Sequence, residues 1–267
     1  MRLVEITRAD RPAFQGRLAA FDAHASYPFG EDRFRLDHGA DYYAFFDRLG
    51  EVSPHVFLDG EDIVGMGVAV LRDVPFRRGE RARRTWYLCD AKVHPERRGQ
   101  KLAYRAAGQR FLRHYLRAQR AYGITMNPGD GSDNGVVRHA MRYRLAPFHL
   151  GGVLGIYSLD ADAMRRLAPL LTAHRGPLEY LSLEGKKDLI MQSSGARLPL
   201  LHVQFGPCAE RGHAAPMEGH THMFCALEGD ALAGALAAEG VDPSASATIL
   251  AHRMQDCDWQ FVLTSDI

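Results

Sequence analysis

A short segment rich in arginine and glycine, Arg98-Gly99-Gln100-Lys101-Leu102-Ala103, joins the end of an apolar run to the start of a helical pattern. The first N–H groups of a helix have no partner within the helix and carry the positive end of its dipole, so this turn is suited to binding an anion. Gly99 would let the backbone come close to a pyrophosphate, and Arg98 would add positive charge. The same residues are equally compatible with an ordinary capped helix whose arginines are solvated.

The elements that position this turn follow from hydrophobic periodicity. Residues 85–93 are predicted to form a central strand, and residues 100–120 an amphipathic helix with arginines between its apolar positions. Elsewhere in the first part of the chain, the patterns predict strands at 2–6, 55–58, 63–71, 122–126 and 148–159, and helices at 12–25, 41–49 and 134–145. The predicted order is therefore β-α-α-β-β-β-α-β-α-β.

Beyond Asp160 the patterns are shorter and predict a small C-terminal α+β domain. They favour helices at 161–171 and 230–239, and strands at 178–183, 198–205, 223–227, 247–253 and 259–264. We expect two domains, at 1–155 and 160–267, with the second acting in substrate selection or in a dimer contact.

The composition is that of an ordinary globular protein. The 267 residues include 33 Lys and Arg against 32 Asp and Glu, and 46% are apolar, which excludes disordered, collagen-like and small disulfide-rich proteins. The net charge of +1 divides into +7 for residues 1–150 and −6 for residues 151–267, and a total near zero argues against a nucleic-acid-binding protein. We expect a cytoplasmic protein, without a membrane span or signal peptide, whose four cysteines are reduced thiols.

The segment from Val93 to Ala103 resembles the acetyl-CoA-binding motif of the GNAT superfamily of N-acetyltransferases. That motif, Arg/Gln-x-x-Gly-x-Gly/Ala after a strand ending Val-x-Pro, is similar to Arg98–Ala103 after Val93-His94-Pro95, with Lys101 where the family usually has glycine. The predicted element order of residues 1–155 is also that of the family. The resemblance implies an α/β fold with a GNAT-like mixed central sheet flanked by helices, and acetyl-CoA as co-substrate without a metal.

The resemblance also implies which residues bind the coenzyme. The pyrophosphate would lie in the turn, the pantetheine would pair with the central strand, and the N–H of Ala91 or its neighbour would polarise the thioester carbonyl. An asparagine before the next helix would contact the pantetheine or anchor its loop. The residues assigned in this way are Ala91, Lys92, Val93, Arg98, Gly99, Gln100, Lys101, Leu102, Ala103 and Asn134.

Catalytic candidates follow from the same resemblance. A family helix ending Tyr-x-x-x-Gly-Phe supplies a tyrosine that protonates the leaving thiolate, and Tyr143 has this spacing, with Pro147 in place of glycine. A surface tyrosine is the alternative. The position of the family's glutamate base is Tyr87 in this chain, so the candidate bases are Asp90 on the same strand, and Glu31 and Asp32 in the loop between the first two helices. Asp90 could instead pair with an arginine, and Glu31 could be solvated.

We therefore expect an acyltransferase that moves an acetyl or other short acyl group from coenzyme A to a small-molecule or peptide amine, without nucleic-acid or membrane partners. The alternative is a non-catalytic acyl-CoA-binding regulatory protein. The histidine-bearing region at 206–225 contains metal-ligand residue types, namely His213, His220 and His222 with Cys208 or Cys225, but their spacing is not that of a zinc ribbon. A tandem acetyltransferase would require a second phosphate turn after residue 160, and residues 228–236 are too weak a match.

Overall fold

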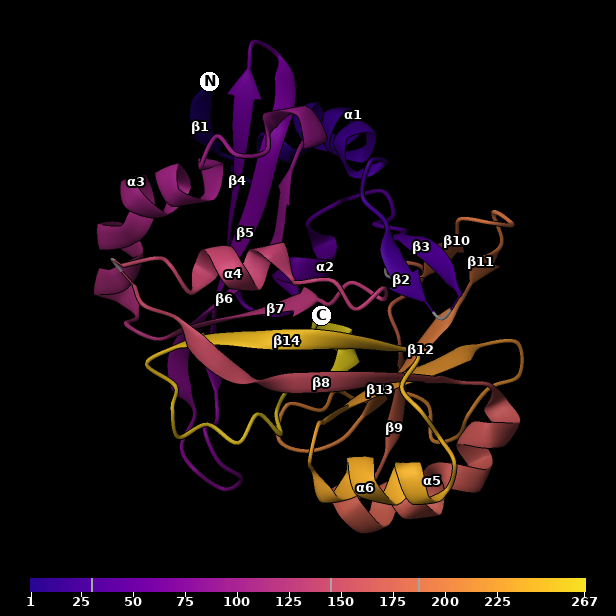
Figure 1. Cartoon of the computed structure of the whole chain (residues 1–267). Coiled ribbons are helices and arrows are strands. Elements are labelled where there is room, and N and C mark those ends of the chain that lie inside the picture. The colour runs from indigo at the N-terminus through magenta and orange to yellow at the C-terminus, as the bar shows by residue number, and fades with distance from the viewer. Residues whose placement is uncertain (30, 145, 187) are drawn as a thin grey trace.

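The structure is a computed structural model that describes residues 1–29, 31–144, 146–186 and 188–267. One mixed sheet of ten strands runs through both parts of the chain, in the order β1-β4-β5-β6-β7-β14-β8-β13-β12-β9, with helices packed around it (Figure 1). Four short strands form a separate sheet in the order β11-β10-β3-β2. The predicted mixed sheet with flanking helices is confirmed.

The N-terminal part contains β1 (Arg2–Glu5), α1 (Arg11–Asp22), β2 (Tyr27–Phe29), β3 (Asp32–Leu36), α2 (Ala44–Asp47), β4 (Glu51–Asp59), β5 (Asp62–Val74), β6 (Arg83–Val93), η1 (Pro95–Arg97), α3 (Leu102–Arg117), β7 (Ala121–Met126), α4 (Gly135–Ala140) and β8 (His149–Leu159). The C-terminal part contains α5 (Ala161–Arg175), β9 (Glu179–Ser182), β10 (Leu189–Met191), β11 (Arg197–Leu198), β12 (Leu200–Gln204), β13 (Thr221–Leu227), α6 (Ala231–Ala238), β14 (Ala245–His252) and η2 (Thr264–Asp266).

Strand β14 joins the two parts of the chain. It pairs antiparallel with β7, where Ile249 faces Ile124, and antiparallel with β8, where Ala247 faces Leu154. Strand β8 in turn pairs with β13 of the C-terminal part. Strand β14 therefore lies next to β7 of the N-terminal part. The sequence predicts a domain boundary at residues 155–160, but β8 runs through most of this range, so the sheet continues from one part of the chain to the other. Figure 1 shows β14 between β7 and β8 in the middle of the molecule.

Two apolar cores lie against this sheet. One includes α1, α2 and the strands they cover, with Leu18 and Phe45 each 1% exposed. The other lies under α5 and α6, where Met164, Leu167 and Leu171 recur at helical spacing and are buried. No helix in the described ranges is long and apolar enough to span a membrane.

Three sequence predictions are wrong in detail. The segment expected as a loop after α1 forms the β2–β3 hairpin, because β3 finds a distant partner in β10. Residues 259–264, expected as a strand, run as a turn and an irregular segment up to residue 263 and then enter η2. Helix α4 ends at Ala140, whereas the predicted helix extends to Leu145, which lies outside the described residues.

Candidate functional site

The central feature of the candidate site is a gap between two parallel strands. Strands β6 and β7 pair only from Trp86 to Leu88, opposite Ala121 to Gly123, although both strands continue further. Beyond this point β7 stays paired with β14. The two neighbouring strands therefore separate, and an extended group could be inserted between them.

The edge of β6 that faces this gap contains the predicted pantetheine-binding residues. Asp90 has a positive φ of 52°, and the register with β5 shifts here, which identifies a β-bulge. The N–H of His94 donates to Val64 O on β5 at 3.0 Å. Because backbone groups alternate along a strand, Lys92 directs its backbone to β5, whereas Ala91 and Val93 direct theirs to the gap.

The turn after β6 has the geometry of an anion site. Gly99 has φ +80°, and Lys101 adopts the left-handed conformation with φ 56° and ψ 33°. Glycine adopts this conformation without strain, which explains why glycine is usual at the position of Lys101. Gln100 is exposed, and Leu102 and Ala103 begin α3.

Neither the N-cap residue of helix α3 nor its first turn supplies a group that would compete with an anion for the free N–H groups. No side chain caps its N-terminus, and its first turn contains no acidic residue. Within the described part of the chain, Arg98 and Lys101 form no ion pair, whereas Arg97 is paired with Asp59 of the β4–β5 turn at 2.6 Å. The helix amides and two cations are thus left for an anionic ligand.

Tyr143, the predicted general acid, lies between α4 and the start of α3. Its ring is 5.2 Å from the ring of Tyr104, whose hydroxyl donates to His139 O at 2.8 Å. Burial, with a smaller effect from Tyr104, raises the pKa of Tyr143, and its Oη has no hydrogen-bond partner among the described residues. The hydroxyl is therefore protonated at neutral pH and available to donate.

Asn134 anchors a loop through all of its side-chain groups. Its Oδ1 accepts from the N–H of Val136 and Val137 and caps α4, and its Nδ2 donates to Met126 O and Asn127 Oδ1. Of the two roles that the sequence left open for Asn134, the geometry corresponds to anchoring.

Asp90 and Lys92 lie in a buried charged cluster that the sequence did not predict. Lys92 Nζ is 2.6 Å from Asp90 Oδ1, and it also contacts Asp22 of α1. Tyr42 donates to Asp90 Oδ2 at 2.8 Å, and the ring of His38 stacks on Tyr42 at 3.9 Å. Asp90 keeps only 7% of its side chain exposed. Both of its oxygens are engaged, one by Lys92 and one by Tyr42.

The cluster shifts the ionisation of its members. Burial alone would raise the pKa of Asp22, but His38, whose Nε2 lies 3.2 Å from Asp22 Oδ2, and Lys92 lower it well below its usual value of 3.8. Burial likewise opposes the charge on Lys92, yet Asp90, Tyr27 and Asp22 raise its pKa above the usual range. Asp22 and Lys92 are therefore charged over the physiological pH range.

Glu31 is exposed at the turn between β2 and β3. Its neighbour Asp32 accepts a hydrogen bond from Ser193 of the C-terminal part. A Cβ added at Gly129, in the loop after β7, would lie 3.1 Å from Pro28 Cβ of β2. The small sheet therefore lies beside the loop that follows β7 (Figure 1).

The other candidate groups from the sequence are the cysteines and the histidine-bearing region. All four cysteines are free thiols, and Cys89 is buried. His222, from the histidine-bearing region, accepts a hydrogen bond from Met217 N at 3.1 Å. Across the described ranges, His, Cys, Asp and Glu form no group of three or more that could hold a metal ion.

Comparisons with known proteins place this architecture. No family model matches the sequence. An uncharacterized protein of Acanthamoeba polyphaga mimivirus is 24% identical over 236 residues, which cover 85% of this chain and 68% of that protein. Among solved structures, a tandem GNAT protein from the clavulanic acid biosynthesis pathway aligns with a TM-score of 0.55 and 14% identity, covering 95% of this chain and 99% of that chain. The chain has the GNAT fold. A GCN5-related N-acetyltransferase from Kribbella flavida aligns over 95% of this chain and 72% of its own, at 13% identity and a TM-score of 0.44.

The turn at Arg98–Ala103 was predicted from the sequence, whereas the partners of Asp90 and Lys92 in the buried cluster were not. Asp22, His38 and Tyr42 occur in α1, in the segment after β3 and just before α2, and no motif joins them. The available signal was weak: two charged residues, Asp90 and Lys92, on a strand that is otherwise apolar and central. Such residues require charged partners when buried, and these partners come from elsewhere in the chain.

Proposed function

We propose that the protein is an acyltransferase that transfers an acetyl or other short acyl group from coenzyme A to a primary amine. The observation that supports this most directly is the gap between β6 and β7, which opens next to the turn at Arg98–Ala103. Positively charged side chains and free helix amides suit the coenzyme phosphates. The backbone of Ala91 and Val93 suits the amides of the pantetheine arm.

In this proposal the protein orients two substrates and moves protons between them. The N–H of Ala91 or Val93 stabilises the negative charge that develops on the thioester oxygen when the amine attacks the acyl carbon. The C–N bond forms, the C–S bond breaks, and Tyr143 donates its proton to the departing thiolate. Holding the reactants together in a ternary complex provides the remaining acceleration.

For the proton of the attacking amine, the geometry favours His38 over Asp90. Both oxygens of Asp90 are engaged, whereas neither ring nitrogen of His38 has a hydrogen-bond partner in the described ranges, and its Nε2 lies 3.2 Å from Asp22 Oδ2. An imidazole oriented by a carboxylate is a common arrangement for a general base. The variant His38→Asn is expected to lower kcat while leaving the affinity for acetyl-CoA unchanged.

The charge at the turn of the β2–β3 hairpin supports one class of amine as the acceptor. Glu31 and Asp32 give negative charge at the turn of the β2–β3 hairpin, so a cationic small molecule or a lysine side chain is the expected acceptor.

The test is release of the coenzyme thiol from acetyl-CoA with a panel of small diamines and lysine-containing peptides. Tyr143→Phe should lower kcat by about 100-fold or more without weakening acetyl-CoA binding, because it removes only the donated proton. Tyr104→Phe is the matched control, since it removes a hydroxyl from the neighbouring ring and should retain most activity. Tight binding of acetyl-CoA with no turnover for any amine would contradict the enzyme and favour a non-catalytic acyl-CoA-binding protein.

A further inference from the structure

A second pair of parallel strands repeats the geometry of the candidate site. Strands β12 and β13 pair over three residues, from Leu200 to His202 opposite Thr221 to Met223, and both strands then continue apart. Strand β8 lies antiparallel beside β13, as β14 lies beside β7. In each half a short helix, α4 or α6, leads from the second parallel strand into the strand that crosses to the other half. The C-terminal half therefore contains its own gap between separating strands.

The C-terminal segment of the chain fills this second gap. Thr264 Oγ1 donates to Met223 O of β13 at 2.9 Å and lies 3.1 Å from His202 Nδ1 of β12. Gln204, further along β12, donates to Ser265 Oγ at 2.9 Å. Cys225, further along β13, has its Sγ 3.5 Å from Val262 O. The segment thus bonds to both strands at the level where they separate.

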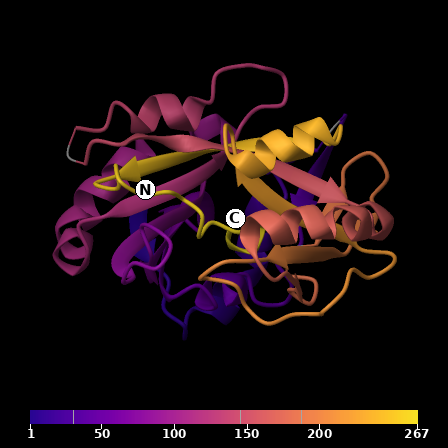
Figure 2. The same cartoon turned by 90° about the horizontal axis from the view of Figure 1, so that it is seen from below.

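Burial shows how completely the segment is enclosed. The six residues from 261 to 266 are each at most 5% exposed. Asp266 also forms ion pairs with Arg72 of β5 at 2.7 Å and with Arg48 at 3.7 Å, both from the N-terminal half. Figure 2 shows this end of the chain at the centre of the molecule, between the two halves. Displacing it would expose apolar surface and leave the buried Arg72 without its carboxylate, whereas Arg48 would keep its pair with Glu210.

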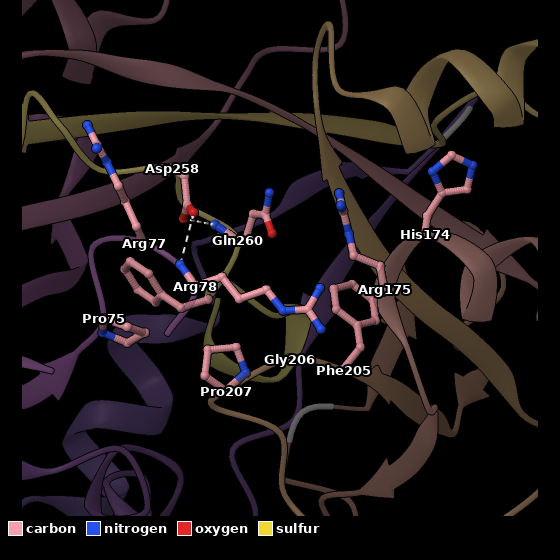
Figure 3. A pocket seen from close by; sticks show the side chains of 11 residues that line it. Pro75, Arg77, Arg78, His174, Arg175, Phe205, Gly206, Pro207, Asp258 and Gln260 are labelled. Atoms are coloured by element: carbon pink, nitrogen blue, oxygen red, sulfur yellow. Dashed lines mark hydrogen bonds between the residues drawn. The ribbon is translucent and has the colours of Figure 1, made fainter. Parts of the chain in front are cut away.

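The second gap also lacks a site for phosphates. The 205–220 segment that follows β12 contains no helix, so no helix amides face the end of that strand. A cavity does lie there, lined by Arg78, Arg175, Gly206 and Asp258 among others (Figure 3), but its volume is only about 20 Å³. That volume holds about one water molecule. Helix α6, which follows β13, has its first N–H groups capped by the carboxylate of Asp230, which also pairs with Arg175.

We infer that residues 261–266 are an intramolecular occupant of the second gap, in the place that an acyl-CoA arm would take, and that each chain binds one acyl-CoA, in the gap between β6 and β7. The single-site part of this inference rests on the proposed function. The conclusion that residues 261–266 occupy the second gap does not rest on the proposed function.

Two glycines provide a matched test of the binding stoichiometry. Gly99 follows β6 with φ +80° and Gly206 follows β12 with φ +77°, and a Cβ at either position meets no atom closer than 3.7 Å. Gly99→Asp and Gly206→Asp therefore add the same charge with the same backbone strain, after the first strand of each pair. Calorimetric titration of the full chain with acetyl-CoA should give one site for the wild type and for Gly206→Asp. For Gly99→Asp the affinity should fall at least 10-fold.

Two sites per chain in the wild type, or equal losses in both variants, would overturn the inference. Hydrogen exchange of residues 261–266 is the second measurement, with protection expected to be high and unchanged at saturating acetyl-CoA. Faster exchange on adding acetyl-CoA would show that the segment leaves the gap and would also overturn the inference. If the wild type binds no acetyl-CoA, the proposed function fails; slow exchange of the segment would still support its place in the gap, and fast exchange would refute it.

Discussion

Lys92 and Asp22, which are 70 residues apart in the chain, form the ion pair on which the buried cluster depends. Because the pKa of Asp22 is lower in the folded protein than its usual 3.8, its charge contributes stability that is fully present above about pH 4. This contribution is lost as the pH falls through the native pKa. The stability of the folded protein is therefore expected to decrease in acid.

The variant Asp22→Asn tests this expectation. It should lower the free energy of unfolding at pH 7 by about 3 kcal/mol, since it leaves Lys92 with one carboxylate fewer in a buried site. Between about pH 4 and pH 2 its stability should fall less steeply than that of the wild type. Denaturant titrations across this range give both quantities, with Asp256→Asn as the control for an exposed carboxylate. Parallel pH profiles for Asp22→Asn and the wild type would contradict the assigned ion pair.

At the scale of elements, the junction between β6 and α3 combines a bulge, a turn and a helix start. Lys101 holds the left-handed conformation at the end of this turn. A residue with a Cβ is disfavoured there by about 1–2 kcal/mol, part of which glycine recovers despite its greater freedom in the unfolded chain. Lys101 in place of the glycine of the family motif therefore affects the stability of the folded protein as well as the charge of the turn.

Lys101→Gly is accordingly expected to raise the free energy of unfolding by about 0.5–1 kcal/mol. Lys101→Ala is the matched control, because it removes the same charge but keeps the Cβ, and it should not stabilise the protein. Chemical denaturation measures both. Equal stability of the two variants would show that the backbone conformation of the turn is not the cause.

At the scale of the whole molecule, the exchange of β8 and β14 makes the two halves one folding unit. The fragment 1–155 lacks β14, which leaves β7 with an unpaired edge, and it ends within β8. Neither 1–155 nor 160–267 is therefore expected to unfold cooperatively alone, whereas the full chain should show one transition. Thermal unfolding followed by circular dichroism measures this. A cooperative transition of 1–155 by itself would support two independent domains.

Individual helices and strands were predicted from local patterns in the sequence. The run that forms β6, the amphipathic pattern of α3 and the turn between them are each encoded within about ten residues, and the structure has them where they were expected. Periodicity works here because it reports which face of an element is buried. The candidate anion site was predictable for the same reason, since its parts are adjacent in the chain.

The sequence by itself thus determined most of the longer strands and helices and the turn between β6 and α3, because their signals are local. Only the tertiary structure decided that β3 pairs with β10, that β14 lies between β7 and β8, and that residues 259–264 are not a strand. It also decided that Lys92 directs its side chain to Asp22. A burial pattern shows that a residue is covered and not what covers it, and these partners are brought together only by contacts between distant parts of the chain.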